Sequence, residues 1–116
     1  MDEKIVESAM QLIFFAGNAK SDVIKAIRSA EAGDFSGADK QMASAKSQIG
    51  EAHKLQTSLM TQEMNDGVVE KTFILIHAQD HFIGAVTSID LGERIISLNK
   101  RVTKLERKLN SWEENQ

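Results

Sequence analysis

The sequence of 116 residues contains no cysteine and no proline, and only seven glycines. Because it has no cysteine, the chain can form neither a disulfide nor a thiolate metal site, and it offers no cysteine nucleophile. An all-β protein would draw on proline and glycine for its many turns, so the scarcity of both favours an all-α fold. The length predicts a single domain, 1–116.

Long apolar runs and a strong charge of one sign are also missing. The chain has 14 Lys and Arg against 17 Asp and Glu, for a net charge of −3. This balance argues against nucleic acid or an anionic membrane as a direct partner. No run approaches the roughly 18 apolar residues of a membrane span, and the acidic start Asp2-Glu3 is unlike a signal peptide. We therefore expect a cytoplasmic protein.

Two turn signals, Gly33-Asp34 and Asn65-Asp66-Gly67, divide the chain into three segments. In the first two segments, apolar residues recur at spacings of three and four, which is typical of amphipathic helices. Those of the first segment are Ile5, Ala9, Leu12, Ala16, Ala19, Val23, Ile27 and Ala30. Those of the second are Phe35, Ala38, Met42, Ala45, Ile49, Ala52 and Leu59.

Two polar residues of the second segment have predicted local roles. Asp34 precedes the apolar stripe and is placed to cap the N-terminus of the helix. Gln56 interrupts the stripe, and a buried amide at that position needs a hydrogen-bond partner.

The third segment, residues 68–112, is too long for the compact core of one chain and carries two apolar tracks in its first half. One track is Val69, Phe73, Ile76 and Ile83, and the other is Leu75, Phe82, Val86 and Ile89. A helix that is apolar over so much of its circumference is buried on more than one side. Since the chain provides only two other helices, we expect the second track to meet another subunit.

Beyond the two tracks, the apolar residues fall into alternating spacings of four and three. They are Leu91, Ile95, Leu98, Val102, Leu105, Leu109 and Trp112. This is the pattern of a coiled-coil seam of about three heptads. Residues 99–116 are therefore predicted to form a coiled-coil extension of the domain.

The most informative stretch is the polar run His77-Ala78-Gln79-Asp80-His81, which has apolar residues on both sides. His77 and His81 are four residues apart and share a helix face. Asp80 fills a gap in the track between Ile76 and Ile83, where a carboxylate would be desolvated and would need compensation.

Three interpretations fit these residues. Two imidazoles four residues apart, together with an acid, can hold a transition metal in a metal-dependent enzyme. A neutral histidine can instead accept a phosphoryl group and pass it on, provided that a neighbour fixes its tautomer. In the third interpretation no chemistry occurs: His77 is a hydrogen-bonded interface residue and His81 is exposed.

The run at residues 77–81 resembles the signature of the lactose/cellobiose-family IIA components of the bacterial phosphoenolpyruvate-dependent sugar phosphotransferase system (PTS). The resemblance extends, in the expected order, to residues 16–21 (AGNAKS), 30–35 (AEAGDF) and 51–57 (EAHKLQT). The resemblance that these stretches carry extends over most of residues 5–98.

This resemblance implies an antiparallel three-helix subunit with a long third helix, assembled as a homotrimer. It implies that His77 takes a phosphoryl group from phospho-HPr and passes it, through a phosphohistidine intermediate, to a cysteine of the IIB component. The process served is the uptake of a β-linked disaccharide of the lactose, cellobiose or chitobiose type. The membrane is then involved only indirectly, through the IIC transporter that binds the sugar.

The resemblance also implies that Asp80 meets its two symmetry mates around a divalent metal, usually Mg²⁺, on the trimer axis. Three carboxylates would repel one another there, whereas a hard cation with oxygen ligands neutralises them. Gln79, His81 and Gln56 are expected to stabilise the transferring phosphoryl group. His53 matches a family position for which we expect a structural role.

An alternative function from a different class also fits the sequence. In it, the chain is a non-catalytic helical scaffold or regulatory bundle that has lost the relay, and its C-terminal seam recruits a partner.

Overall fold

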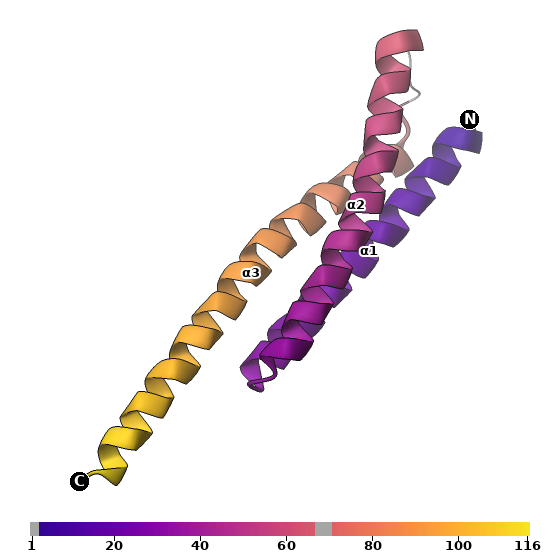
Figure 1. The fold of residues 1–116 in the computed structure, drawn as a ribbon. Coiled ribbons are helices and arrows are strands. Elements are labelled where there is room, and N and C mark those ends of the chain that lie inside the picture. The colour runs from indigo at the N-terminus through magenta and orange to yellow at the C-terminus, as the bar shows by residue number, and fades with distance from the viewer. Residues whose placement is uncertain (1–2, 67–70) are drawn as a thin grey trace.

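The computed structural model describes residues 3–66 and 71–116, and in these it contains three α-helices and no strand. The helices α1 (Glu3–Glu31), α2 (Phe35–Asp66) and α3 (Phe73–Glu114) form a narrow rod of 72 × 19 × 19 Å. α2 runs antiparallel to α1, and α3 then runs in the direction of α1 (Figure 1). The predicted all-α bundle with a long third helix is thereby confirmed.

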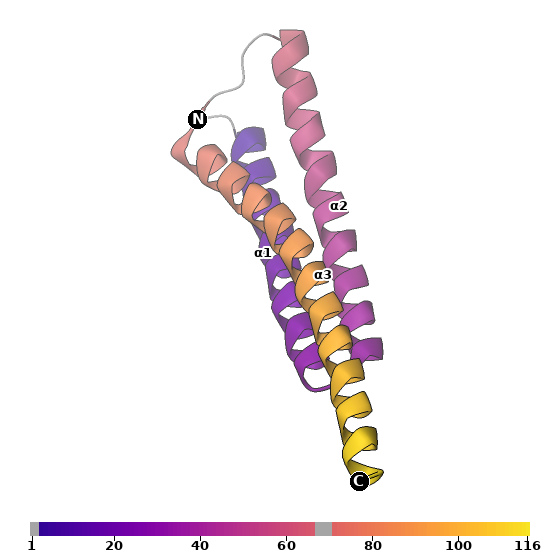
Figure 2. The same cartoon turned by 90° about the vertical axis from the view of Figure 1, so that its left-hand side faces the viewer.

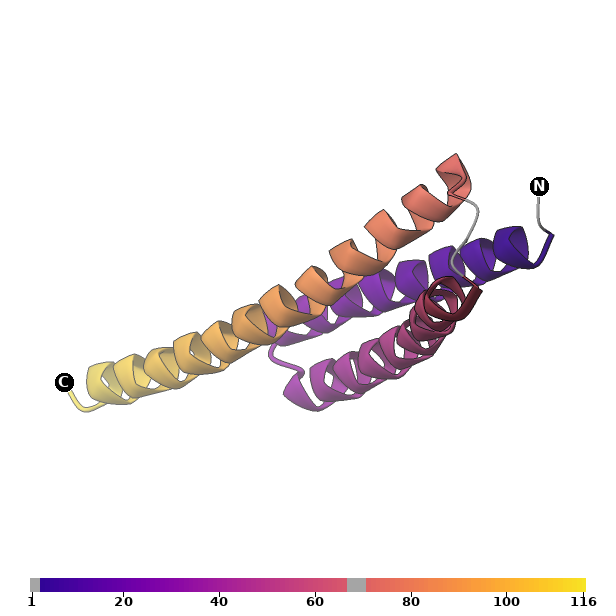
Figure 3. The same cartoon turned by 90° about the horizontal axis from the view of Figure 1, so that it is seen from above.

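α1 is the helix that holds the bundle together. It contacts both other helices along much of its length, whereas α2 and α3 meet over a shorter stretch (Figure 3). None of the helices in the described part of the chain has the length and hydropathy that crossing a bilayer requires.

The turn between α1 and α2 is built by hydrogen bonds that the sequence anticipates. Gly33 adopts the left-handed conformation, with φ at 83°. The N–H of Gly33 donates to the carbonyl of Ala30 at 3.0 Å, and that of Asp34 donates to Ser29 at 2.8 Å, which is a Schellman motif. The carboxylate of Asp34 accepts from the N–H of Gly37 at 2.9 Å, so the predicted N-cap is confirmed.

The second turn signal, Asn65-Asp66-Gly67, begins before α2 ends. Asn65 and Asp66 are the last residues of α2, so the helix continues through the first part of the signal. α3 begins after Thr72, whose Oγ1 accepts from the N–H of Leu75 at 3.2 Å. Gly67 of the turn signal, Val68 at the start of the third segment and Val69 of its first apolar track lie outside the described residues.

The core of the bundle has two larger apolar ends joined by a layer of alanines. The end near the start of α1 includes Leu12, Leu59 and Phe82, and the end near the α1–α2 turn includes Val23 and Met42. The layer between them consists of Ala16, Ala19 and Ala85, with a half-buried Ile49 against it. Small side chains in this layer let α1 and α3 approach closely.

The buried face of α1 differs from the predicted stripe at one position. Ala26 is buried, while Ile27, which the spacing places on the core face, is only half-buried. Seven of the eight predicted residues of α1 are fully buried, which confirms the helix and its orientation.

One face of α3 is buried and the opposite face is exposed. The buried residues are Leu75, Ala78, Phe82, Ala85, Gly92 and Ile96. The exposed apolar residues, here called the outer seam, are Phe73, Ile76, Ile83, Leu91, Leu98, Val102, Leu105, Leu109 and Trp112. Leu75 and Phe82 of the second track are packed within the subunit, so the expectation that this track meets another subunit is wrong, and the first track is the exposed one. Val86 departs from the prediction, because 46% of it is exposed although its track is otherwise covered.

The last part of α3 projects beyond the turn between α1 and α2 (Figure 2). It remains helical through Glu114. Its apolar side chains are exposed, from 49% at Val102 to 64% at Leu105.

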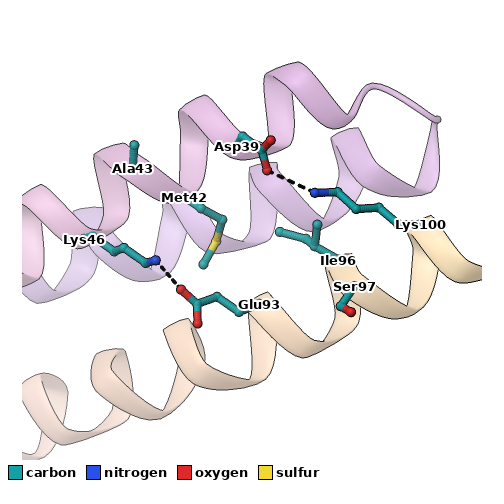
Figure 4. Close-up of a pocket in the computed structure, with 8 residues that line it drawn as sticks. All are labelled: Asp39, Met42, Ala43, Lys46, Glu93, Ile96, Ser97 and Lys100. Carbon is teal, nitrogen blue, oxygen red and sulfur yellow. Dashed lines mark ion pairs between the residues drawn. The ribbon is translucent and has the colours of Figure 1, made fainter.

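Near this end, α2 and α3 form a shallow groove (Figure 4). Met42 and Ile96 line it, and two ion pairs cross it: Lys46 to Glu93, and Lys100 to Asp39 at 3.5 Å. The groove lies on a part of α3 remote from the polar run at residues 77–81.

Replacement of glycine by alanine is expected to have opposite effects on stability at two positions within the helices. A Cβ on Gly92 would lie 2.6 Å from Cγ1 of Val23, a stiff buried side chain. We therefore expect Gly92→Ala to lower the free energy of unfolding by about 1–3 kcal/mol. A Cβ on the exposed Gly50 would meet nothing within 4 Å, so Gly50→Ala should raise that free energy by about 1 kcal/mol through helix propensity.

Urea unfolding of both variants at one protein concentration measures the two effects. Shifts of the same sign would contradict the close approach of α3 to Val23.

Candidate functional site

Two histidines form a pair on the surface of α3, one and two turns after its start. His77 is exposed and His81 is half-buried. Their Nε2 atoms are 3.1 Å apart, with ring centroids at 4.5 Å and the rings nearly perpendicular. The ring of Phe73 stacks on the other side of His77 at 6.4 Å. The structure therefore brings together the two histidines that the spacing places on one face.

The surroundings of His81 favour one arrangement of the protons in this pair. Nδ1 of His81 is buried and has no hydrogen-bond partner. A buried nitrogen lone pair without a donor costs less free energy than a buried N–H without an acceptor. We therefore assign the proton of His81 to Nε2. His81 then donates to Nε2 of His77, whose own proton is on Nδ1. The nitrogen of His77 that faces His81 carries a lone pair.

The pKa of His81 supports this assignment. Burial lowers its pKa, and the positive charge of Lys20 and the neighbouring His77 lower it further, while Asp80 acts in the opposite direction. His81 is therefore neutral at pH 7, as a single donated proton requires. The expectation that His81 is exposed is wrong, because His81 is half-buried and is the more covered of the two.

Lys20 reaches this site from α1 and was not singled out by sequence reasoning. It follows Ala19 of the alanine layer, and its side chain lies against Gly84 of α3. A Cβ on Gly84 would be 2.9 Å from Nζ of Lys20 and 3.1 Å from its Cε. The only available signal was the position of Lys20 within the matched stretch at residues 16–21.

Gln56 and Gln79 form a second polar group. Nε2 of Gln56 donates to Oε1 of Gln79 at 3.0 Å, so the amide that interrupts the stripe of α2 has the partner it was predicted to need. Gln79 lies about 200° around the axis of α3 from His77, at 3.6 residues per turn. The structure thus joins the two glutamines to each other, and it does not bring them to His77 of the same subunit.

Asp80 lies on the outer seam of α3, between Ile76 and Ile83. All three are exposed in the subunit. The sequence predicts a desolvated carboxylate at this position, but within one subunit the carboxylate remains in contact with solvent. One carboxylate offers oxygen ligands of the kind that a hard cation prefers. Within the described ranges, no group of three or more histidine or acidic residues gathers where it could hold a metal ion.

His53 belongs to α2 and packs against the core. Its ring stacks on Phe82 of the core at 6.2 Å. This contact is consistent with the structural role expected for it.

The sequence matches one protein family over most of its length. The match is to the family "PTS system, Lactose/Cellobiose specific IIA subunit" and covers residues 7–100. Among curated relatives, the lichenan-specific phosphotransferase enzyme IIA component of Bacillus subtilis is 34% identical over 104 residues, which are 90% of this chain and 94% of that protein.

Solved structures give the same result. The cellobiose-specific enzyme IIA of Bacillus anthracis has a TM-score of 0.86 at 36% identity, covering 90% of this chain and 95% of the other. The IIA(Chitobiose) of Escherichia coli, solved in complex with HPr, has a TM-score of 0.77 at 29% identity, covering 88% and 99%. A family match over residues 7–100 and relatives above 30% identity along nearly the whole chain lead to one conclusion. The chain belongs to the lactose/cellobiose-specific IIA family and is a component of the phosphoenolpyruvate-dependent sugar phosphotransferase system.

Proposed function

We propose that this chain is a phosphocarrier that accepts a phosphoryl group from phospho-HPr on His77 and passes it to a cysteine of the IIB component. The relay serves the uptake of a β-linked disaccharide of the lactose, cellobiose or chitobiose type. The observation that carries the proposal is the exposed imidazole of His77, whose Nε2 faces a neutral donor on His81. The relay operates in the cytoplasm, and the membrane component IIC binds the sugar.

The chemistry uses the lone pair on Nε2 of His77. In the first step this nitrogen attacks the phosphorus carried by HPr. The bond from phosphorus to its carrier atom on HPr breaks, with the electron pair returning to that atom, as the N–P bond on His77 forms. In the second step a cysteine sulfur of IIB attacks the same phosphorus, and His77 is released with its lone pair restored. His77 keeps its proton on Nδ1 throughout.

His81 supplies a positioned hydrogen-bond donor for both steps. Its Nε2–H points at the nitrogen that reacts and is free to move to a phosphoryl oxygen once the N–P bond has formed. Donors held in place stabilise the charge on the transferring oxygens without reorganisation. The buried side of His81 keeps the ring in this orientation.

Two different proteins must reach His77, so its exposure suits the role. The supporting comparison is the E. coli relative, which was solved in complex with HPr. HPr is accordingly the first partner we propose for this chain.

The functional assembly that we propose is a homotrimer around the outer seam of α3. An apolar seam along a helix of 42 residues, interrupted by Asp80, is more hydrophobic surface than a soluble monomer ordinarily exposes. From Leu98 to Trp112 its residues are spaced by four and three, which suits parallel helices around a common axis.

Such an assembly would complete the site. The histidine pair and Gln79 lie on opposite flanks of the outer seam. Around a threefold axis, one flank of each α3 faces the opposite flank of its neighbour. His77 of one subunit would therefore face Gln79 and Gln56 of the next, which gives the glutamines the phosphoryl-stabilising role that they do not have within one subunit.

Asp80 would lie on the axis of this trimer, where three copies of its carboxylate converge. One oxygen-donor side chain from each subunit fits a hard divalent cation, for which we propose Mg²⁺. A bound cation there supplies charge neutralisation and takes no part in the transfer. Asp80 is then a structural residue.

The extension at residues 99–116 continues the same seam. Leu98 lies 18 residues after Asp80, which is five whole turns, so the two share one line along α3. We propose that the three projecting ends of α3 form a parallel coiled coil of the single domain 1–116.

Phosphorylation of His77 has a direct test. Incubation with phosphoenolpyruvate, enzyme I and HPr should add one acid-labile phosphate to each chain, and His77→Ala should abolish it. His81→Ala should still accept the phosphate, about tenfold or more slowly, because it lacks the donor. His53→Ala is the matched control and should label at the wild-type rate.

Labelling that persists in His77→Ala would exclude His77 as the acceptor. A wild-type chain that takes no phosphate would favour the alternative function, a scaffold that has lost the relay.

Substitutions at Asp80 and at Ile83 are expected to have opposite effects on trimer formation. Asp80→Leu should remain trimeric, because apolar packing replaces a buried cluster of charge. Ile83→Asp should dissociate the trimer, because it adds uncompensated carboxylates to the seam. Sedimentation velocity distinguishes the two, and a monomeric Asp80→Leu would mean that apolar packing cannot replace the cluster of charge on the axis.

Removal of the metal tests the same site. A chelator should lower the melting temperature of the wild type and leave that of Asp80→Leu unchanged.

The proposed coiled coil predicts a further contrast. Leu105→Asp should weaken association, raising the protein concentration at which half the chains are trimeric. Ser111→Asp, exposed and off the seam, should leave association unchanged. Equal behaviour of the two variants in sedimentation equilibrium would mean that the projecting ends do not associate.

A further inference from the structure

We propose that Lys20 is the cation that pairs with the phosphoryl group on His77, and that Gly84 keeps open the space in which its ammonium lies. This inference rests on the proposed relay through His77. It names a role for a residue of α1, whereas the side chains proposed above to stabilise the phosphoryl group come from α2 and α3.

The position of Lys20 is the first support. Its ammonium lies on the face of α3 that carries the histidine pair, because Gly84 is seven residues, almost two whole turns, after His77. The residue at 84 has no side chain, and a Cβ there would meet Nζ of Lys20 at 2.9 Å. The alanine layer beside it, Ala19 and Ala85, sets the short distance between the helices that this contact needs.

The charge balance of the site is the second support. A phosphoryl group brings about two negative charges at pH 7. The side chains assigned to it so far, His81 and the glutamines, are neutral, and Asp80 is an acid on the neighbouring face. Lys20 is the positive side chain whose charge acts on His81.

The absence of a competing partner is the third support. Within the described residues, no carboxylate forms an ion pair with Lys20. Lys20 is a half-buried residue whose ammonium ends a flexible four-carbon stem, with three donors still available. A cation without a counter-ion, on the face of α3 that carries the histidine pair, is suited to an anion that arrives only during the reaction.

The decisive measurement is the equilibrium of phosphoryl exchange between HPr and this protein. The equilibrium constant compares the free species, so a variant that only weakens the docking of HPr leaves it unchanged. Lys20→Met removes the charge and keeps the stem, and it should shift the equilibrium toward phospho-HPr by about tenfold or more, the usual size for a lost charge-assisted hydrogen bond. Lys20→Arg should restore most of the wild-type value.

Lys25→Met, an exposed lysine of the same helix, is the matched control and should leave the equilibrium unchanged. Lys20→Gln serves as the second neutral variant, and circular dichroism establishes that each variant is folded. An equilibrium constant for Lys20→Met and Lys20→Gln equal to that of the wild type would overturn the inference.

Gly84→Ala tests the second half of the proposal. Its Cβ should displace the ammonium, so it should shift the equilibrium in the wild-type background and have no further effect in Lys20→Met. An equal effect in both backgrounds would mean that Gly84 does not act through Lys20.

The two proposals fail in different ways. If the wild type takes no phosphate, or if His77→Ala still takes it, the relay itself is wrong. If the wild type is labelled on His77 and Lys20 has no effect on the equilibrium, only the inference about Lys20 is wrong.

Discussion

The close approach of α1 and α3 at the alanine layer is the constraint on which the rest of the structure depends. Ala16, Ala19 and Ala85 have no side chain beyond Cβ, so the two helix backbones can lie close together at mid-length. The larger side chains of the core are gathered at either end of the bundle. This close approach fixes the rotation of α3, and the rotation decides which residues are buried and which reach solvent.

With the rotation fixed, α3 presents three different surfaces. Its core face holds Leu75 and Phe82, its flank next to α1 carries His77 and His81, and its outer seam carries Asp80. The histidine pair owes its properties to this intermediate position. His81 is covered enough to stay neutral and oriented, while His77, one turn earlier, remains accessible to a partner protein.

Much of the fold could be predicted from the sequence, because helix formation and amphipathic pattern are local properties. The turn at Gly33 and the cap at Asp34 followed from residue type, since a left-handed conformation suits glycine and an N-cap suits aspartate. The signal at Asn65 and Asp66 was less exact, because helix ends can extend through residues that also favour turns. Of the site, the pairing of His77 with His81 followed from their spacing of four.

Two properties of the site depend on contacts between helices, so they could not be predicted from the spacing of residues along one helix. The burial of His81 rather than His77, and the unpartnered Nδ1 that fixes its proton, depend on how α3 is rotated against α1. Lys20 is 64 residues from Gly84 in sequence, so only the folded chain reveals that its ammonium lies against that glycine. The sequence by itself determined the three helices, their apolar faces and the histidine spacing, because these follow from residue type and helical period. The tertiary structure decided which polar groups meet, because the distance and rotation between helices are set by the volumes of the side chains that lie between them.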